Sequence, residues 1–179
     1  MVGRWVAGSA CIDQAALTTL VLGSVASCSG AKLTDVTPMP AGEITFAADS
    51  TYTISLAVDV TMRIEFPRSC LSQATSCSAV ETSAFLANLI GHTGVGSIAC
   101  GGDTSCSCNM IGELEFGSSS PSDSSGTYTL SQSTLSLAST TGVSDSGPYC
   151  VQGSSLHVTL SGMSSGMAII PANLAFTKM

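Results

Sequence analysis

Hydrophobic and polar residues alternate without interruption from Thr51 to Phe66. Every even-numbered position in this run is apolar, and every odd-numbered one is Thr, Ser, Ala, Asp, Arg or Glu. Because successive side chains of a strand point to opposite faces, a period of two predicts a strand with one buried face. At about 3.3 Å per residue the run would span about 50 Å. We therefore expect it to bend, as strands do in barrels and coiled sandwiches, or to break into a hairpin.

Shorter stretches of alternating or β-prone residues predict further strands on both sides of this run. They lie at 3–10, 42–48, 110–116, 127–131, 134–139, 148–152, 156–161, 167–170 and 174–176. Turns are expected at Asp49-Ser50, Gln132-Ser133 and Gly153-Ser154. Gly30 to Gly42, which contains two prolines, and the Ser-rich Gly117 to Gly126 are expected to be loops.

Two short helices interrupt the strand pattern. Ile12 to Leu22 has apolar residues on one helical face, and Asp13 is placed to cap its N-terminus. Ser78-Ala79-Val80-Glu81 is a capping box, in which the Ser and Glu side chains each bind a free backbone N–H at a helix start. That second helix is expected to run to about Ile90.

The strands follow one another as hairpins rather than as βαβ units, which favours an all-β fold. The sequence predicts a single domain over residues 1–179, an antiparallel up-and-down β-barrel with one or two short helices. A β-sandwich is the alternative.

The composition restricts the class of partner. Charged residues make up 9% and hydrophobic residues 44% of the chain, so we expect a true core rather than disorder. The net charge is −7 with five basic residues, which leaves no cationic footprint for nucleic acid or an anionic membrane surface. No apolar stretch is long enough to insert into a bilayer.

Eight cysteines predict four disulfides and an oxidising compartment, so the protein is expected to be secreted, periplasmic or on the cell surface. The export signal is expected to have been removed upstream of Met1. Zinc is the alternative, but Cys106-Ser107-Cys108 is a C-x-C motif without the spacing of a zinc ribbon. No metal or other cofactor is expected.

The titratable residues offer no catalytic constellation, and no catalytic residue is assigned. His157 alternates with apolar neighbours and should point outward, and His92 follows the end of the second predicted helix. Glu113 and Glu115 would share one face of a strand, where a solvated outer surface is the simpler interpretation than acid/base chemistry. The charged residues are expected on the outer face.

Gly3-Arg4-Trp5 opens the first strand, and a short helix and a series of hairpins follow. Gly126-Thr127-Tyr128-Thr129 opens a later strand, and Tyr149-Cys150 lies in another. This order resembles the lipocalin/calycin family, including bacterial secreted lipocalin-like domains. The resemblance implies that Trp5 closes the floor of a barrel beneath a basic residue of the last strand, for which Lys178 is the only candidate.

Together, the pattern and the resemblance predict a secreted protein that binds a small hydrophobic molecule inside the barrel. Two alternatives stay open: a barrel enzyme, an isomerase or cyclase acting on an apolar substrate, and a structural or cell-surface interaction domain without a small ligand. The alternation does not distinguish a cavity from a filled core, and it sets no oligomeric state. The expected ligand-binding residues are Trp5, Tyr52, Ile54, Leu56, Val58, Met62, Phe66, Met110, Leu114, Phe116, Tyr128 and Leu130.

Overall fold

A computed structural model describes residues 1–23, 30–70, 76–78, 95–115, 124–140, 144–163 and 169–179 of the chain. The described part is all-β apart from one helix, α1 (Gln14–Gly23), and one 3-10 turn, η1 (Arg68–Cys70). The strands are β1 (Gly3–Ile12), β2 (Lys32–Phe46), β3 (Thr51–Pro67), β4 (Val95–Gly101), β5 (Ser105–Glu115), β6 (Ser124–Ser131), β7 (Thr134–Ser139), β8 (Ser144–Gln152), β9 (Ser155–Met163) and β10 (Ile169–Lys178).

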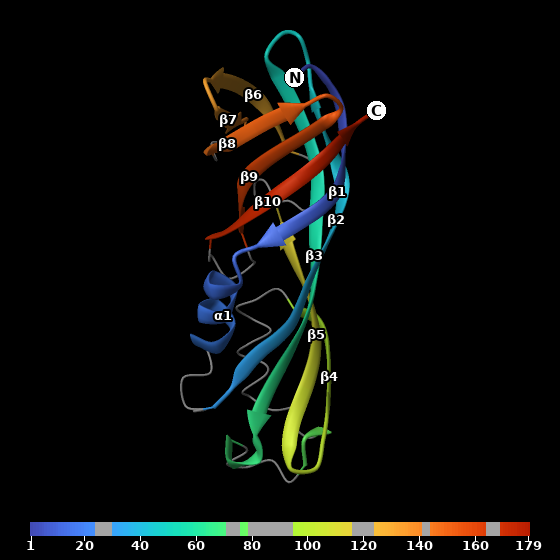
Figure 1. Ribbon diagram of the computed structural model, residues 1–179, viewed down its shortest axis with the longest axis vertical. Helices are drawn as coiled ribbons and strands as arrows, with labels where there is room; N and C mark the ends of the chain where they lie inside the picture. The colour runs from blue at the N-terminus through green and yellow to red at the C-terminus, as the bar shows by residue number, and fades with distance from the viewer. Residues whose placement is uncertain (24–29, 71–75, 79–94, 116–123, 141–143, 164–168) are drawn as a thin grey trace.

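These strands form one antiparallel sheet that curves into a partial ring (Figure 1). Pairing passes from β10 through β1, β2, β3, β6, β7 and β8 to β9, and β9 pairs back onto β10. β5 and β4 extend the sheet from the far half of β3. The all-β antiparallel prediction is therefore confirmed. No helix in the described part of the chain is long and apolar enough to cross a membrane.

β3 is the alternating run, and it stays one unbroken strand of 17 residues rather than a hairpin. Its even-numbered side chains are all buried, as the period of two predicts. The strand is longer than one compact core would need because it pairs with two different strands in turn along one side. Residues 51–54 pair with β6, and residues 57–67 pair with β5. Figure 1 shows β3 running along most of the length of the molecule.

β2 corrects the loop expected from Gly30 to Gly42, because residues from Lys32 onward are already a strand. Pro38 and Pro40 suggested a break, since a proline has no N–H and fits a strand only where its nitrogen faces an unpaired edge. Among the described strands β1 is the neighbour on that side of β2, and it pairs with Glu43–Phe46 alone. The two prolines lie beyond that pairing, on an edge.

β10 is likewise one strand rather than two short ones divided by Pro171. The ladder from β1 ends at the pair Ile12–Ala172, one residue before the proline. β1 therefore does not require a hydrogen bond from the Pro171 nitrogen. On the other side of β10, the pairing with β9 continues through Pro171. The turns expected at Gln132 and Gly153 are confirmed, and both residues have positive φ.

α1 confirms the first predicted helix with slightly shifted ends. The Asp13 carboxylate accepts hydrogen bonds from the backbone N–H groups of Ala15 and Ala16 at 2.9 and 3.0 Å, which is an N-cap. Leu17 and Val21 are buried, and α1 packs against β2. The second predicted helix, from Ser78 to Ile90, falls almost wholly outside the described residues.

The disulfides depart from the predicted set of four. Cys77 is bonded to Cys106, and Cys100 is bonded across the β4–β5 ladder to Cys108. Cys70 is also disulfide-bonded.

Cys11 and Cys150 are exposed free thiols, so the prediction of four disulfides is wrong. They lie on β1 and β8, which are separated by β10 and β9. Three strand spacings amount to about 14 Å, whereas the Cα atoms of a disulfide lie about 5.5–6 Å apart.

The turn between β2 and β3 yields a pH prediction. Asp49 accepts hydrogen bonds from the Thr51 hydroxyl at 2.6 Å and from the Thr51 backbone N–H at 3.0 Å, and these bonds lower the pKa of Asp49. A lowered folded pKa gives stability that is complete above the unfolded value of about 3.9 and is lost as pH falls through the folded value. Replacing Thr51 by Val should raise the Asp49 pKa in a carboxyl NMR titration. Thr53→Val, on the same exposed face, is the control, and an equal rise there would contradict the assignment.

The two described disulfides close loops of different length, which predicts unequal contributions to stability. Cys77 and Cys106 are 29 residues apart, and Cys100 and Cys108 are 8 apart. On the chain-entropy model, replacing the first pair by alanines should cost about 3.5 kcal/mol and replacing the second about 2.5 kcal/mol. Guanidinium unfolding of the two double variants measures the difference. A larger loss from the 100–108 pair would show that loop length is not the controlling factor.

Candidate functional site

The predicted ligand-binding residues are divided between two regions of the sheet. Trp5, Tyr52, Ile54, Leu56 and Tyr128 are buried on the strands that form the ring. Alternation along a strand identifies its buried face, but it does not say which neighbours cover each part of that face.

The second group belongs to the half of β3 that pairs with β5. Val58, Met62, Phe66 and Met110 are buried there, below the ring in Figure 1. The Leu114 backbone pairs with Val58, its side chain is not described, and Phe116 lies outside the described residues. The expected residues therefore do not surround one common interior.

Leu130 corrects a further expectation, because it is 43% exposed. Its register partner Leu135 is fully buried, so Leu130 is on the correct face of β6. It lies next to the turn into β7, at the end of the hairpin, where no further strand covers it among the described residues.

The inner face of the ring is packed on β2, β7, β9 and β10, whereas on β8 Val151, the register partner of Leu156, is 39% exposed. None of its apolar residues on β2, β7, β9 and β10 is more than 6% exposed: Ile44, Phe46, Leu135, Leu137, Leu156, Val158, Leu160, Ala172, Leu174 and Phe176. Ligand cavities usually reach about 300 Å³ or more, and a space of that size would leave several lining side chains exposed to water. These residues instead touch one another as the core of a domain does.

Tyr128 shows how a polar group is accommodated in this packed face. Its ring lies 4.9 Å from that of Phe46 in an edge-to-face arrangement. Its hydroxyl donates a 3.0 Å hydrogen bond to the Ala47 backbone oxygen. Both the ring and the hydroxyl therefore have partners within the protein.

Asp145 departs from the expectation that charged residues lie on the outer face. Its register partner on β7 is the buried Leu137, so its half-buried side chain lies on the inner side of the ring. The predicted strand began at Pro148 and missed this residue. Extending the alternation back from Tyr149 through Gly147 to Asp145 would have found it.

Trp5 lies at one end of the ring. It is 1% exposed, and its indole N–H donates a 2.8 Å hydrogen bond to the Met1 backbone oxygen. Lys178 on β10 is its register partner, with the ammonium nitrogen 5.6 Å from the ring centroid. At that separation a cation is attracted to the face of an indole.

Gly3 lies beside this contact in a backbone conformation that favours glycine. Its φ is +132°, and a Cβ atom at this position would lie 2.9 Å from the Lys178 Cε. A side chain here would therefore meet an unfavourable backbone conformation, and the flexible end of Lys178 would have to shift. The glycine of Gly3-Arg4-Trp5 thus leaves room for Lys178 above Trp5.

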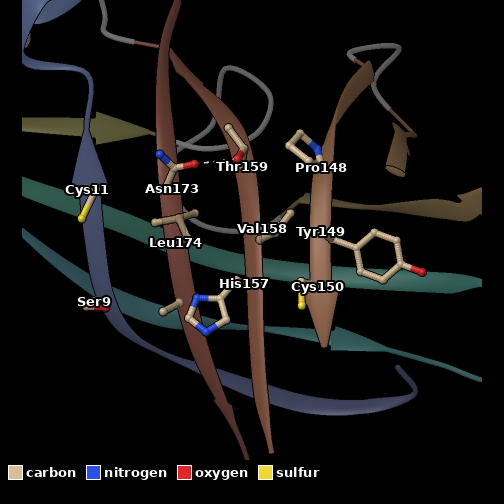
Figure 2. A pocket seen from close by; sticks show the side chains of 11 residues that line it. Ser9, Cys11, Pro148, Tyr149, Cys150, His157, Val158, Thr159, Asn173 and Leu174 are labelled. Carbon is tan, nitrogen blue, oxygen red and sulfur yellow. Dashed lines mark hydrogen bonds between the residues drawn. The ribbon is translucent and has the colours of Figure 1, made fainter. Parts of the chain in front are cut away.

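A shallow hollow lies on the outer side of β1, β10, β9 and β8, with a volume of about 430 Å³ (Figure 2). Cys11, Cys150 and His157 line it, and Cys150 is the register partner of His157. Thr159 donates a 2.6 Å hydrogen bond to the Asn173 side-chain oxygen in the same hollow. His157 is exposed, as predicted, and His92 lies outside the described residues.

Within the described ranges, no three His, Cys, Asp or Glu side chains lie close enough together to hold a metal ion. The chain matches no protein-family model, no curated protein and no solved structure.

The Gly3–Trp5–Lys178 arrangement predicts a context-dependent substitution. Gly3→Ala should lower the free energy of unfolding by about 1–3 kcal/mol, because it forces an alanine into a glycine conformation against Lys178. Guanidinium unfolding followed by the fluorescence of Trp5, the single Trp, measures this. In a Lys178→Ala background the contact is gone, so the same substitution should cost less. An equal cost in both backgrounds would show that Lys178 is not the group in contact.

Proposed function

We propose that the ring of strands is a lipocalin-like β-barrel with a filled interior, and that the protein is a secreted-type interaction domain that acts through its outer surface. The observation that carries this proposal is the packed inner face, on which Leu135 and Leu156 are fully buried. Because the described inner side chains of β7 and β9 are buried against one another, the outer surface of these strands is the part available for recognition.

The barrel part of the proposal is supported by the pairing that leads from β10 around to β9 and back. It is supported also by Lys178 above Trp5, since lipocalins place a basic residue of the last strand over the Trp of the first. In this proposal the Trp5 end is the floor of the barrel.

The secreted part is supported by the disulfides Cys77–Cys106 and Cys100–Cys108, which persist in oxidising compartments. The outer face is rich in Ser and Thr. Such a surface contacts another protein at little desolvation cost compared with a charged one.

A small hydrophobic ligand is the second candidate function, favoured by the same Trp5–Lys178 contact because the lipocalin resemblance implies ligand carriage. A ligand in the ring would have to displace side chains such as Phe46 and Phe176, each 1% exposed. A barrel enzyme has less support. In the described part of the ring, Asp145 is the carboxylate on the inner side, and a single half-buried carboxylate defines no acid/base pair.

Fluorescence titration with cis-parinaric acid and with retinol separates the first two functions. The wild-type protein should show no saturable quenching of Trp5 and no co-purifying ligand in native mass spectrometry. Leu156→Ala is the matched control: it opens an apolar cavity in the ring, should cost about 2–5 kcal/mol, and should admit xenon or benzene. Stoichiometric binding of either probe by the wild type would replace the proposal with the carrier function.

A further inference from the structure

Cys11 and Cys150 are the free cysteines of the described chain, and they line the same outer hollow. The described cysteines at 70, 77, 100, 106 and 108 are disulfide-bonded. Disulfides at these sites imply an oxidising environment, where two exposed thiols do not persist without a reason. Leftover cysteines in such a chain indicate intermolecular pairing or reactive thiols.

The two thiols cannot pair with each other inside one molecule. Figure 2 shows them at opposite sides of the hollow, with β10 and β9 between them. Cys11 is in register with Asn173, and Cys150 is in register with His157. The separation of about 14 Å across the sheet therefore excludes the short Cα–Cα distance that a disulfide needs.

The surface between the two thiols suits a second copy of the same chain. Among the described residues, no Asp, Glu, Lys or Arg lines the hollow, although the chain carries a net charge of −7. Two such molecules repel each other through most of their surfaces, and this repulsion is weakest where carboxylates are absent. The lining residues are small or uncharged, among them Ser9, Ala175 and Thr159.

We propose that two copies of the protein join face to face through this hollow, with Cys11 of each copy bonded to Cys150 of the other. A twofold axis places one patch against itself, so a contact between Cys11 and the partner's Cys150 occurs twice. The axis passes near His157 and Ala175, which lie between the two thiols. The inference rests on the proposed interaction function and names its partner.

Each bond forms by thiol–disulfide exchange with an oxidised low-molecular-weight disulfide, such as oxidised glutathione. One cysteine thiolate attacks that disulfide and releases a thiol. The partner's thiolate then attacks the mixed disulfide and releases a second thiol. Two cysteine thiols lose two protons and two electrons, and the small disulfide takes up both electrons and is reduced to two thiols.

The first test asks whether the bond forms between molecules. The full-length protein is purified as a monomer with Cys11 and Cys150 reduced, once with ¹⁴N and once with ¹⁵N. Equal amounts of the two preparations are mixed and oxidised with glutathione disulfide. Non-reducing gels and light scattering should show a dimer. Digestion without reduction should give a Cys11–Cys150 peptide pair, half of it carrying one label of each kind. A linked peptide that carries only matched labels would place the bond within one chain and overturn the proposal.

Single variants test the reciprocal pairing. Cys11→Ser and Cys150→Ser should each remain monomeric under oxidation, since neither retains both halves of the bond. Their equimolar mixture should recover a covalent dimer held by one disulfide. A covalent dimer of either variant alone, or none from the mixture, would contradict the pairing. A dimer that dissociates with a chelator but resists reductant would indicate a shared metal instead.

A charge placed near the axis tests the surface without touching the thiols. His157→Glu puts two carboxylates opposite each other and should slow covalent dimerisation about tenfold at low salt, with partial recovery at high salt. Thr53→Glu, an equivalent exposed position on β3, is the matched control and should not slow it. Equal slowing by both variants would show that the effect is net charge rather than this face.

The outcome is separable from that of the proposed function. If the protein stays monomeric and binds no lipophilic probe, the proposed interaction function is supported and the proposal of a second copy as its partner is contradicted. A protein that binds the probe stoichiometrically loses the interaction function whether or not it dimerises.

Discussion

The buried face of β3 is the constraint on which the other elements depend. Eight consecutive even-numbered side chains on one strand must all be kept from water, and each buried apolar side chain contributes about 1.5–3 kcal/mol. One compact layer of neighbours cannot cover a strand of 17 residues. On one side β3 pairs with β2 along nearly its whole length, and on the other it pairs with β6 at residues 51–54 and with β5 at residues 57–67, so different parts of its buried face belong to different parts of the sheet.

The same division explains where the cysteines are used. The described disulfides Cys77–Cys106 and Cys100–Cys108 lie at the β4–β5 end, which has fewer hydrogen-bonded strands to hold it. Covalent links there compensate for a smaller core. The described ring strands β1 and β8 carry Cys11 and Cys150, and neither is in a disulfide. This leaves Cys11 and Cys150 on the outer surface, where a bond to another molecule is the chemistry open to them.

The end of the ring shows how a short motif acts only through a distant partner. Gly3 and Trp5 come from the first strand, and Lys178 comes from the last. The glycine leaves space, the indole offers its face, and the ammonium lies over it. The resemblance implied a basic residue over Trp5, with Lys178 as the candidate, whereas the preference for glycine at position 3 comes from a backbone φ of +132° that only the structure shows.

The sequence by itself determined the strands whose periodicity is local: the β3 face, the hairpins around Gln132 and Gly153, and the Asp13 cap. These depend on neighbouring residues, so pattern and turn chemistry suffice. Only the tertiary structure decided that Pro38 and Pro171 lie where no neighbouring strand needs an N–H from them. It also decided that Leu130 is exposed at the end of its hairpin, that Asp145 lies on the inner side of the ring, and that two cysteines stay free. Each of these depends on which strand lies alongside, and alternation specifies a face without specifying the neighbour that covers it.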